Sequence, residues 1–160
     1  MENTWTNLDH LEGEIVVIQG TDVDDTTSTY DSETVSSGTV TLIDGDDYNF
    51  VKQAVIGLSF RFTLQPMRMD ISGHGGTTHG SIKKTAEIVV SLYKARDVYY
   101  GSSLSDLHII PDTKDTLFTG DAVLPFDGGF TLDDEIYISG ISPHQCTIRA
   151  IIPRVKKTGR

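Results

Sequence analysis

The amino-acid sequence predicts an all-β protein, an antiparallel β-sandwich or barrel with long polar loops and little helix. Apolar and polar residues alternate along several short segments, as they do in strands that bury one face. Clusters of Gly, Asp and Ser separate these segments, and no window shows the period of about 3.6 residues that marks an amphipathic helix. A chain of 160 residues has the length of one domain, or at most of two very small ones. We therefore expect a single β-rich domain over residues 1–160.

The segment TNLDHLEG, residues 6–13, predicts one capped helical turn before the first strand. The side-chain oxygen of Asn7 can accept an unpaired backbone N–H at the start of the turn. Leu8 and Leu11 are three residues apart and share one face of it. Gly13 suits the left-handed conformation in which helices commonly end.

The same turn carries an acid, an imidazole and an acid within four residues, Asp9, His10 and Glu12. This grouping raises the question of a catalytic or metal site. Successive residues on a helical turn point about 100° apart, so the side chains of Asp9 and His10 diverge. We interpret the segment as a structural corner.

The clearest predicted strand covers residues 53–65, QAVIGLSFRFTLQ, and Pro66 ends it or moves it to a sheet edge. One face of this strand carries six apolar residues: Ala54, Ile56, Leu58, Phe60, Phe62 and Leu64. Residues 86–93 repeat the pattern with Ala86, Ile88, Val90 and Leu92. The other predicted strands cover 14–19, 39–43, 135–139 and 146–152, and DGG at 127–129 predicts a turn.

Three polar segments fall outside the predicted strands. Residues 20–38 form an acidic stretch longer than the roughly 12–15 residues usual for a structureless connection, so we expect an acidic loop that is flexible or gains order from a neighbour. Residues 70–81, DISGHGGTTHGS, form the long connection between the two strongest strands. Residues 153–160 are expected to form a basic C-terminal tail.

Charge is distributed unevenly along the chain. Residues 1–50 contain twelve acids and no Lys or Arg, whereas residues 51–160 contain thirteen bases and eleven acids. An acidic protein lacks the clustered Lys and Arg that give ordinary affinity for phosphate backbones. The exception is the C-terminus, where the candidate contact residues are Arg154, Lys156, Lys157 and Arg160. The alternative for these bases is a solvated tail.

Two histidines in the glycine-rich segment, His74 and His79, are candidate metal ligands, with Asp70 as a candidate third. A catalytic zinc site needs three protein ligands and an open position. The five-residue offset does not match helical ligand pairs, and the spacing identifies no third ligand. The alternative is a polar loop, and we predict no metal here.

Two acidic segments contain residues of the kind that bind calcium. Four residues match positions 1, 3, 5 and 12 of a calcium loop: Asp22, Asp24, Thr26 and Glu33. Thr27 stands where that loop needs Gly, and no flanking helices are predicted. The second segment, DGDD at 44–47, is better explained as a hairpin turn in which Gly45 supplies the positive φ. We therefore predict neither a metal nor a cofactor.

No nucleophile motif, phosphate-binding loop or dinucleotide fingerprint occurs in the sequence, so we expect no enzyme and no small-molecule substrate. The single cysteine, Cys146, cannot form an internal disulfide, and its place at the start of a strand is typical of a small buried thiol. No signal peptide and no apolar run of about 20 residues occurs, so we expect no membrane.

Six segments in order resemble the C-terminal region of tail nozzle proteins of short-tailed phages, also called tail tubular protein B or tail stabilisation proteins. The matching segments are LDHLEGE at 8–14, SSGTVTL at 36–42, VIGLSFRFTLQPM at 55–67, SIKKTAEIVVSLYKARDVYYG at 81–101, LFTGDAVLPFDGGF at 117–130 and PHQCTIRAIIPRV at 143–155. The positions that match the family are Leu8, Asp9, His10, Leu11, Glu12, Gly13, Gly57, Leu58, Phe118, Gly120 and Asp121. Family members are several times longer, so we expect a stand-alone module or a separate gene product that supplies the end piece.

The resemblance implies a structural virion protein of the phage tail, made in the host cytoplasm. It would assemble with itself in a ring, six-fold as a hexamer, and with other phage tail proteins around the DNA exit channel. DNA would pass without specific binding, because like charge keeps the duplex from adhering. The acids expected to face the lumen or solvent are Asp22, Asp24, Asp25, Asp44, Asp46 and Asp47.

A second hypothesis is a receptor- or carbohydrate-binding β-sandwich module of a phage tail. Its candidate stacking residues are Trp5, Tyr93, Tyr99 and Tyr100. Two of these lie at a strand end, where aromatic side chains more often pack across strands.

Overall fold

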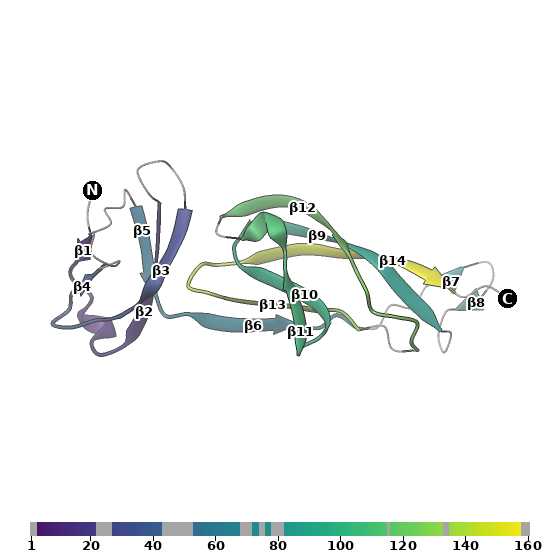
Figure 1. Ribbon diagram of the computed structural model, residues 1–160, viewed down its shortest axis with the longest axis horizontal. Helices are drawn as coiled ribbons and strands as arrows, with labels where there is room; N and C mark the ends of the chain where they lie inside the picture. Colours follow the sequence, from purple (N-terminus) through teal and green to yellow (C-terminus); the bar gives the residue numbers. More distant parts are fainter. Residues whose placement is uncertain are drawn as a thin grey trace. The chain divides into compact units, whose positions relative to one another are not determined.

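The computed structural model describes residues 3–21, 27–42, 53–67, 72–73, 76–77, 82–114, 116–132 and 135–157 (Figure 1). Antiparallel strand pairs make up most of this part of the chain. Its helices are two single 3-10 turns, η1 (Asp9–Leu11) and η2 (Pro111–Thr113). The prediction of an all-β fold is confirmed.

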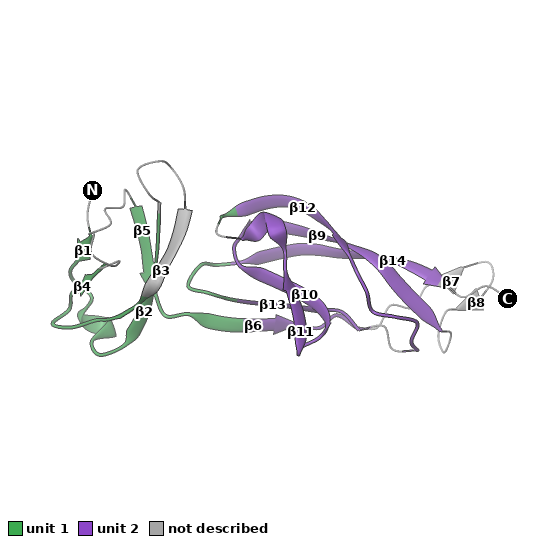
Figure 2. Cartoon of the chain, viewed as in Figure 1, with its two compact units in different colours: residues 1–61, 115–117, 141–145 green, residues 62–114, 118–140, 146–160 purple. Residues whose placement is uncertain are grey.

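The chain divides into two compact units (Figure 2). Unit 1 comprises residues 1–61, 115–117 and 141–145, and unit 2 comprises residues 62–114, 118–140 and 146–160. The chain passes from one unit to the other more than once. That the whole chain folds as a single domain stays a prediction.

Unit 1 contains a three-stranded sheet and a two-stranded one. The order of the first is β3 (Thr27–Thr34), β2 (Ile15–Thr21), β5 (Gln53–Gly57). The second pairs β1 (Thr4–Trp5) with β4 (Val40–Thr41). The buried core consists of Val16, Ile18, Val35, Val40 and Leu42. Alternation explains the contribution of β2, because Val16 and Ile18 are two residues apart and share a face.

Unit 2 is a β-sandwich. Its four-stranded sheet has the order β11 (Asp106–Ile109), β10 (Val98–Ser103), β13 (Tyr137–Ser142), β6 (Phe60–Leu64). Its three-stranded sheet has the order β12 (Phe118–Pro125), β9 (Lys83–Ala95), β14 (Thr147–Lys157). A short pair, β7 (Ser72–Gly73) with β8 (Gly76–Thr77), falls within residues 70–81.

One core joins the two sheets of the sandwich. Buried residues come from β9 and β12 on one side and from β10 and β13 on the other, as expected when inward-facing side chains of two sheets interdigitate. They are Ile88, Val90, Leu92, Ala95, Val98, Tyr100, Ile110, Ala122, Leu124, Phe126, Ile136 and Ile138. The predicted inward face of 86–93 is confirmed, since Ile88, Val90 and Leu92 are fully buried.

The prediction of one strand over 53–65 is wrong. The segment forms β5 and β6, which belong to different sheets and are separated by Leu58 and Ser59. Leu58 is 47% exposed and Phe60 is 48% exposed, so the expected continuous buried face is broken. Alternation specifies which residues share a side of an extended chain, but it does not specify which sheet covers that side.

The predicted flexible loop over 20–38 is also wrong for the residues that the structure describes. Residues 27–34 are β3, which pairs with β2 along its length. β3 is an edge strand, and its place rests on backbone pairing rather than on an apolar face, which a hydrophobicity pattern cannot detect. Residues 22–26 lie outside the described part.

The expectation of a basic tail over 153–160 is wrong for residues 153–157, because they belong to a strand. β14 continues to Lys157, which pairs with Lys83 of β9. Pro153 interrupts the predicted pattern without ending the strand, because β14 is an edge strand and tolerates a missing donor. Arg160 lies outside the described residues.

The corner at residues 6–13 is confirmed in part. Residues Asp9–Leu11 form the turn η1, Leu8 and Leu11 pack against the core of unit 1, and Gly13 has a φ of +79°. The Asn7 cap is wrong, because η1 has no side-chain capping hydrogen bond and Asn7 itself has a φ of +67°.

Candidate functional site

The outer face of the β12–β9–β14 sheet is a regular surface of unit 2 that the sequence did not single out. Side chains alternate between its two faces, so the residues between the buried ones on β9 point outward. Val89 lies directly opposite Val123 of β12 and Ile152 of β14. Val123 is 59% exposed and Ile152 is 54% exposed. These three residues form an apolar row across all three strands.

A basic and aromatic corner lies on the same face, near one end of the sheet. Tyr93 is four residues beyond Val89 on β9 and shares its outward direction. The guanidinium carbon of Arg149 lies 4.9 Å from the centre of the Tyr93 ring, and the Lys94 ammonium lies 5.6 Å from it. Both distances fall within the range of cation–π attraction. All three side chains are exposed.

Two backbone irregularities place these cations. The pairing of β14 with β9 shifts register between Ile148 and Ala150, so Arg149 is the extra residue of a β-bulge. Lys94 has a φ of +47°, and its N–H donates to Oγ1 of Thr119 at 3.0 Å. Bulges commonly redirect a side chain. Here the bulge brings a cation from β14 to an aromatic ring on β9.

Polar residues border the apolar row on both sides. Arg154 and Glu87 form an ion pair across β14 and β9. Asp121 of β12 lies opposite Ser91 of β9 and is exposed. A row of apolar side chains with a polar margin is the usual composition of a protein–protein contact surface.

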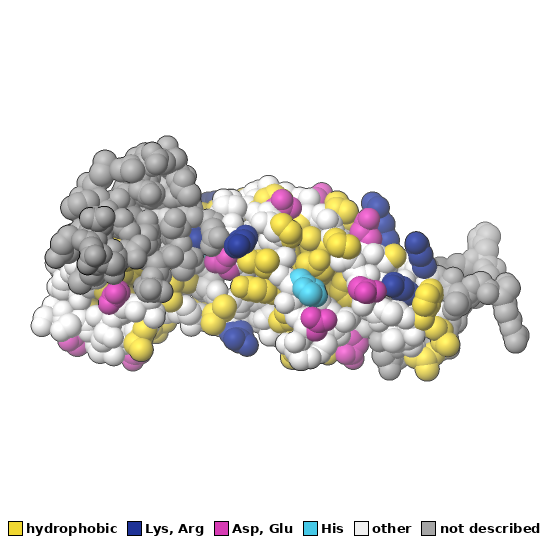
Figure 3. All heavy atoms as spheres, viewed as in Figure 1, with side chains coloured by type: hydrophobic (Ala, Val, Ile, Leu, Met, Phe, Trp, Pro, Cys, Tyr) yellow, Lys and Arg dark blue, Asp and Glu magenta, His cyan; other side chains and the backbone are white. Residues whose placement is uncertain are grey.

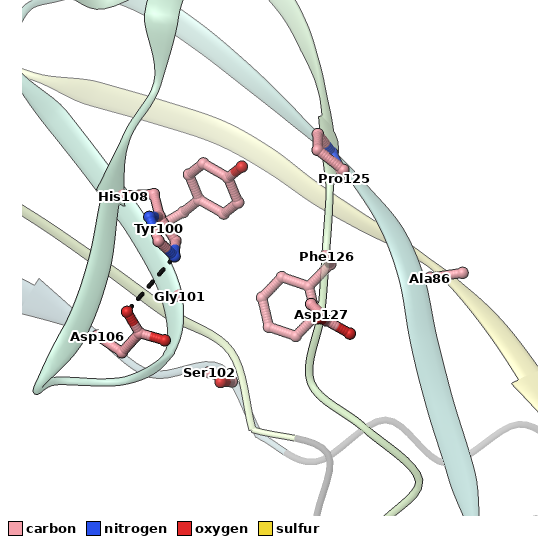
Figure 4. A pocket seen from close by; sticks show the side chains of 9 residues that line it. All are labelled: Ala86, Tyr100, Gly101, Ser102, Asp106, His108, Pro125, Phe126 and Asp127. Carbon is pink, nitrogen blue, oxygen red and sulfur yellow. Dashed lines mark ion pairs between the residues drawn. The ribbon is translucent and has the colours of Figure 1, made fainter.

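A cleft of about 560 Å³ lies in unit 2 between residues of both sheets (Figure 4). Tyr100, His108 and Asp106 line one side, and Phe126, Pro125 and Ala86 line the other. Gly101, Ser102 and Asp127 complete the lining. Its volume lies within the range of about 300–1,000 Å³ that is typical of small-ligand pockets.

The polar groups of the cleft are weakly held. Nε2 of His108 lies 3.5 Å from Oδ1 of Asp106, and both side chains are largely exposed. The His108 and Tyr100 rings are 6.2 Å apart and tilted by 57°. Burial raises the pKa of the Tyr100 hydroxyl, so it stays protonated. Asp127 pairs with Lys84 at 3.0 Å. The geometry offers hydrogen-bonding groups, and it holds neither an activated nucleophile nor an enclosed base.

The sequence contained a signal for part of this cleft. Asp106 and His108 are two residues apart on one strand, so they necessarily share a face. The partners of this pair come from residues distant in sequence, Tyr100 and Phe126, and no local pattern joins them.

The Asp9–His10–Glu12 group has a structural role in the case of Glu12. Its carboxylate accepts hydrogen bonds from the backbone N–H groups of Gly38 at 2.7 Å and Ser37 at 2.9 Å. These bonds, first that from Gly38 and then that from Ser37, hold the pKa of Glu12 below its ordinary value. Glu12 therefore ties the corner to the turn at 36–39. Asp9 and His10 are exposed.

Most of the residues that were candidates for binding a metal or for facing the lumen lie outside the described part of the chain. These are Asp22, Asp24, Asp25, Thr26, Asp44, Asp46, Asp47, Asp70, His74 and His79. Glu33, the last position of the calcium-loop match, belongs to β3. Among the described residues, no group of three or more His, Cys, Asp and Glu is arranged to hold a metal ion.

The four stacking candidates are distributed over both units. Trp5 is partly buried against the core of unit 1, whereas the three tyrosines belong to unit 2. Tyr100 is only 8% exposed and is part of the sandwich core. Tyr99 is half-buried on β10. Tyr93, 38% exposed, is the one of the four with a substantial accessible ring in the described structure.

Other positions that match the family, Gly57 and Gly120, lie in strands and beside neighbouring side chains. Gly57 ends β5, and a Cβ there would touch Pro143 at 3.5 Å. Gly120 lies against the Phe118 ring, which packs on the sandwich core. Cys146, just before β14, is half-buried against that core, and burial raises the pKa of its thiol.

A scan against protein-family models and a search of curated proteins found no match to this chain. Within the described ranges, no helix has the length and the apolar character that crossing a membrane requires.

Proposed function

We propose that this protein is a non-enzymatic structural subunit of a phage virion. It forms a ring at the tail nozzle, the end of the tail tube through which DNA is ejected. The proposal starts from the six segments that resemble nozzle proteins. The observation that carries it is the uncovered apolar row of Val89, Val123 and Ile152 on a regular sheet face.

An exposed apolar row on a sheet face favours a subunit contact over simple exposure to solvent. Burying it removes apolar surface from water, at roughly 25 cal/mol per Å². The face is also continuous over three strands, which suits packing against another protein. Figure 3, which draws one face of the molecule, shows that hydrophobic side chains also occur among charged ones elsewhere on unit 2.

The open sheet edges are less suited to assembly than the face. β14 is the longer edge of its sheet, but it contains Pro153, two register shifts and Lys156. Proline, bulges and lysine are devices that prevent strands from pairing edge to edge. Packing of sheet faces is therefore the mode of assembly that we favour.

The acidic N-terminal third supports the passage of DNA without adhesion. Its twelve acids are unaccompanied by Lys or Arg over residues 1–50. Replacing the lumen candidates by Asn should leave assembly intact and slow DNA ejection; they are Asp22, Asp24, Asp25, Asp44, Asp46 and Asp47. Unchanged ejection would exclude a lumen-facing role for these acids.

The test of the function is immunogold electron microscopy of phage particles produced with this chain. Label at the far end of the tail is expected. Label on the capsid or on fibres, or none on any particle, would overturn the nozzle assignment. Negative-stain microscopy of the purified chain is the complementary measurement, and closed rings are the expected particles.

The second candidate function is a receptor- or carbohydrate-binding module, and the cleft between Tyr100 and Phe126 is the observation that favours it. Asp106 and Asp127 could accept hydrogen bonds from sugar hydroxyl groups. The two rings are 8% and 4% exposed, so they offer little stacking surface. A glycan array separates the candidates, because a binding module gives hits that a D106N variant loses and a ring subunit gives none.

A further inference from the structure

We propose that the Tyr93–Arg149 corner and the adjacent apolar row form a docking surface for a second copy of this chain, and that it receives the acidic turn of that copy. The docking surface consists of Tyr93, Lys94, Arg149, Val89, Val123 and Ile152. The acidic turn consists of residues 9–15. The inference rests on the proposed function, because it names the neighbour in the ring.

The residue types at the corner are those that contribute most to protein–protein binding. Tyrosine and arginine are enriched among interface residues whose truncation weakens binding strongly. Here Arg149 lies over the exposed ring of Tyr93, so both side chains are arranged before a partner arrives. A partner then binds with less loss of side-chain entropy than it would on two mobile side chains.

Charge identifies the partner. Lys94 and Arg149 are exposed cations at one corner, Arg154 is neutralised by Glu87, and Asp121 is the exposed acid on the same face. The corner itself is therefore positive and fits an acidic surface. The first 50 residues of this same chain supply one, with twelve acids and no compensating base.

The acidic turn has the matching composition. Asp9, Glu12 and Glu14 are all exposed in and after η1. Ile15, the next residue, is 62% exposed. Three carboxylates beside one protruding apolar side chain complement two cations beside an apolar row. Complementary charges of this kind orient partners and speed their encounter.

The contact would be heterologous, since the docking surface and the acidic turn are different parts of the chain. Heterologous contacts generate a ring when the rotation between copies closes. Each subunit then uses its docking surface toward one neighbour and its acidic turn toward the other.

The test uses the full chain and charge reversal on each side. Variant X carries K94E and R149E, which reverse the docking surface. Variant Y carries D9K and E14K, which reverse the acidic turn and spare Glu12 and its hydrogen bonds. The matched control carries R61E and K114E, two exposed cations that belong to neither the docking surface nor the acidic turn. Circular dichroism melting of every variant separates a failure to fold from a failure to assemble.

Mass photometry over a concentration series measures the assembly. For X alone and for Y alone, the concentration at half-assembly should rise by about tenfold or more, which corresponds to about 1.4 kcal/mol. The control should assemble as the unmodified chain does. An equimolar mixture of X and Y should recover assembly, because the reversed surface of each then meets the complementary surface of the other.

The outcomes separate the inference from the function. If the unmodified chain forms rings and X assembles equally well, the docking surface is wrong while the ring function stands. If X and Y each fail and their mixture also fails, the pairing of these two surfaces is wrong. If the unmodified chain stays monomeric at every concentration, a second copy is not the occupant, and tail labelling on particles still decides the function independently.

Discussion

Replacing Gly101 by Ala is the sharpest test of how the cleft side of the sandwich is built. Gly101 is buried on β10, where it pairs with Tyr137 of β13. A Cβ at this position would overlap the backbone carbonyl oxygen of Asp106, and it would lie 3.2 Å from both the Asp106 carbonyl carbon and Cδ2 of Leu107. The obstruction is backbone of β11, so it cannot be relieved by a change of rotamer.

The expected loss of stability follows from this contact. Overpacking a filled site costs about 1–3 kcal/mol because the surrounding backbone must shift. A glycine-to-alanine change also restricts the unfolded chain, which returns about 0.4–1 kcal/mol. The net destabilisation of about 1–2 kcal/mol lowers the melting temperature of a protein of this size by about 2–8 °C.

The assay is thermal unfolding followed by circular dichroism, with Gly57→Ala as the matched control. A Cβ at Gly57 would meet Pro143 at 3.5 Å, an ordinary contact, and no positive φ is involved. The control should melt within about 2 °C of the unmodified protein or slightly above it. A G101A protein that melts as high as G57A would refute the close approach of β10 and β11.

Three further predictions concern stability. Glu12→Gln should lower the melting temperature at neutral pH. The pKa of Glu12 in the folded protein lies below its ordinary value of 4.5, so the charged carboxylate stabilises the fold above pH 4.5. The difference in melting temperature between the two proteins should therefore disappear as the pH falls through the folded pKa. A difference that does not change with pH would contradict this. Leu92→Ala, at a fully buried core position, should cost about 2–5 kcal/mol by urea titration, and a cost under about 1 kcal/mol would place Leu92 outside a packed core. Calorimetry should show one cooperative transition if residues 1–160 form a single domain, and two resolved transitions would show that the two units unfold independently.

Local sequence features predicted much of unit 2 and little of the candidate site. Ile88, Val90 and Leu92 alternate over a segment that is buried on one side, so their spacing alone indicated a strand and its inward face. Val89 occupies an equally clear outward position. Its partners Val123 and Ile152 are more than 30 residues away, and only the register of three strands brings them into one row. The position of Arg149 over Tyr93 could not be predicted either, because it depends on a bulge for which the sequence contains no signal.

The sequence by itself determined the all-β class, the corner near the N-terminus and the uneven distribution of charge, because these follow from local periodicity, turn chemistry and composition. Only the tertiary structure decided that residues 53–65 divide between two sheets, that polar residues 27–34 form a strand, and that the basic segment before Lys157 belongs to β14. The physical reason is the same in each case. Backbone hydrogen bonding between distant strands is available to any extended segment, so the choice of partner depends on the fold as a whole.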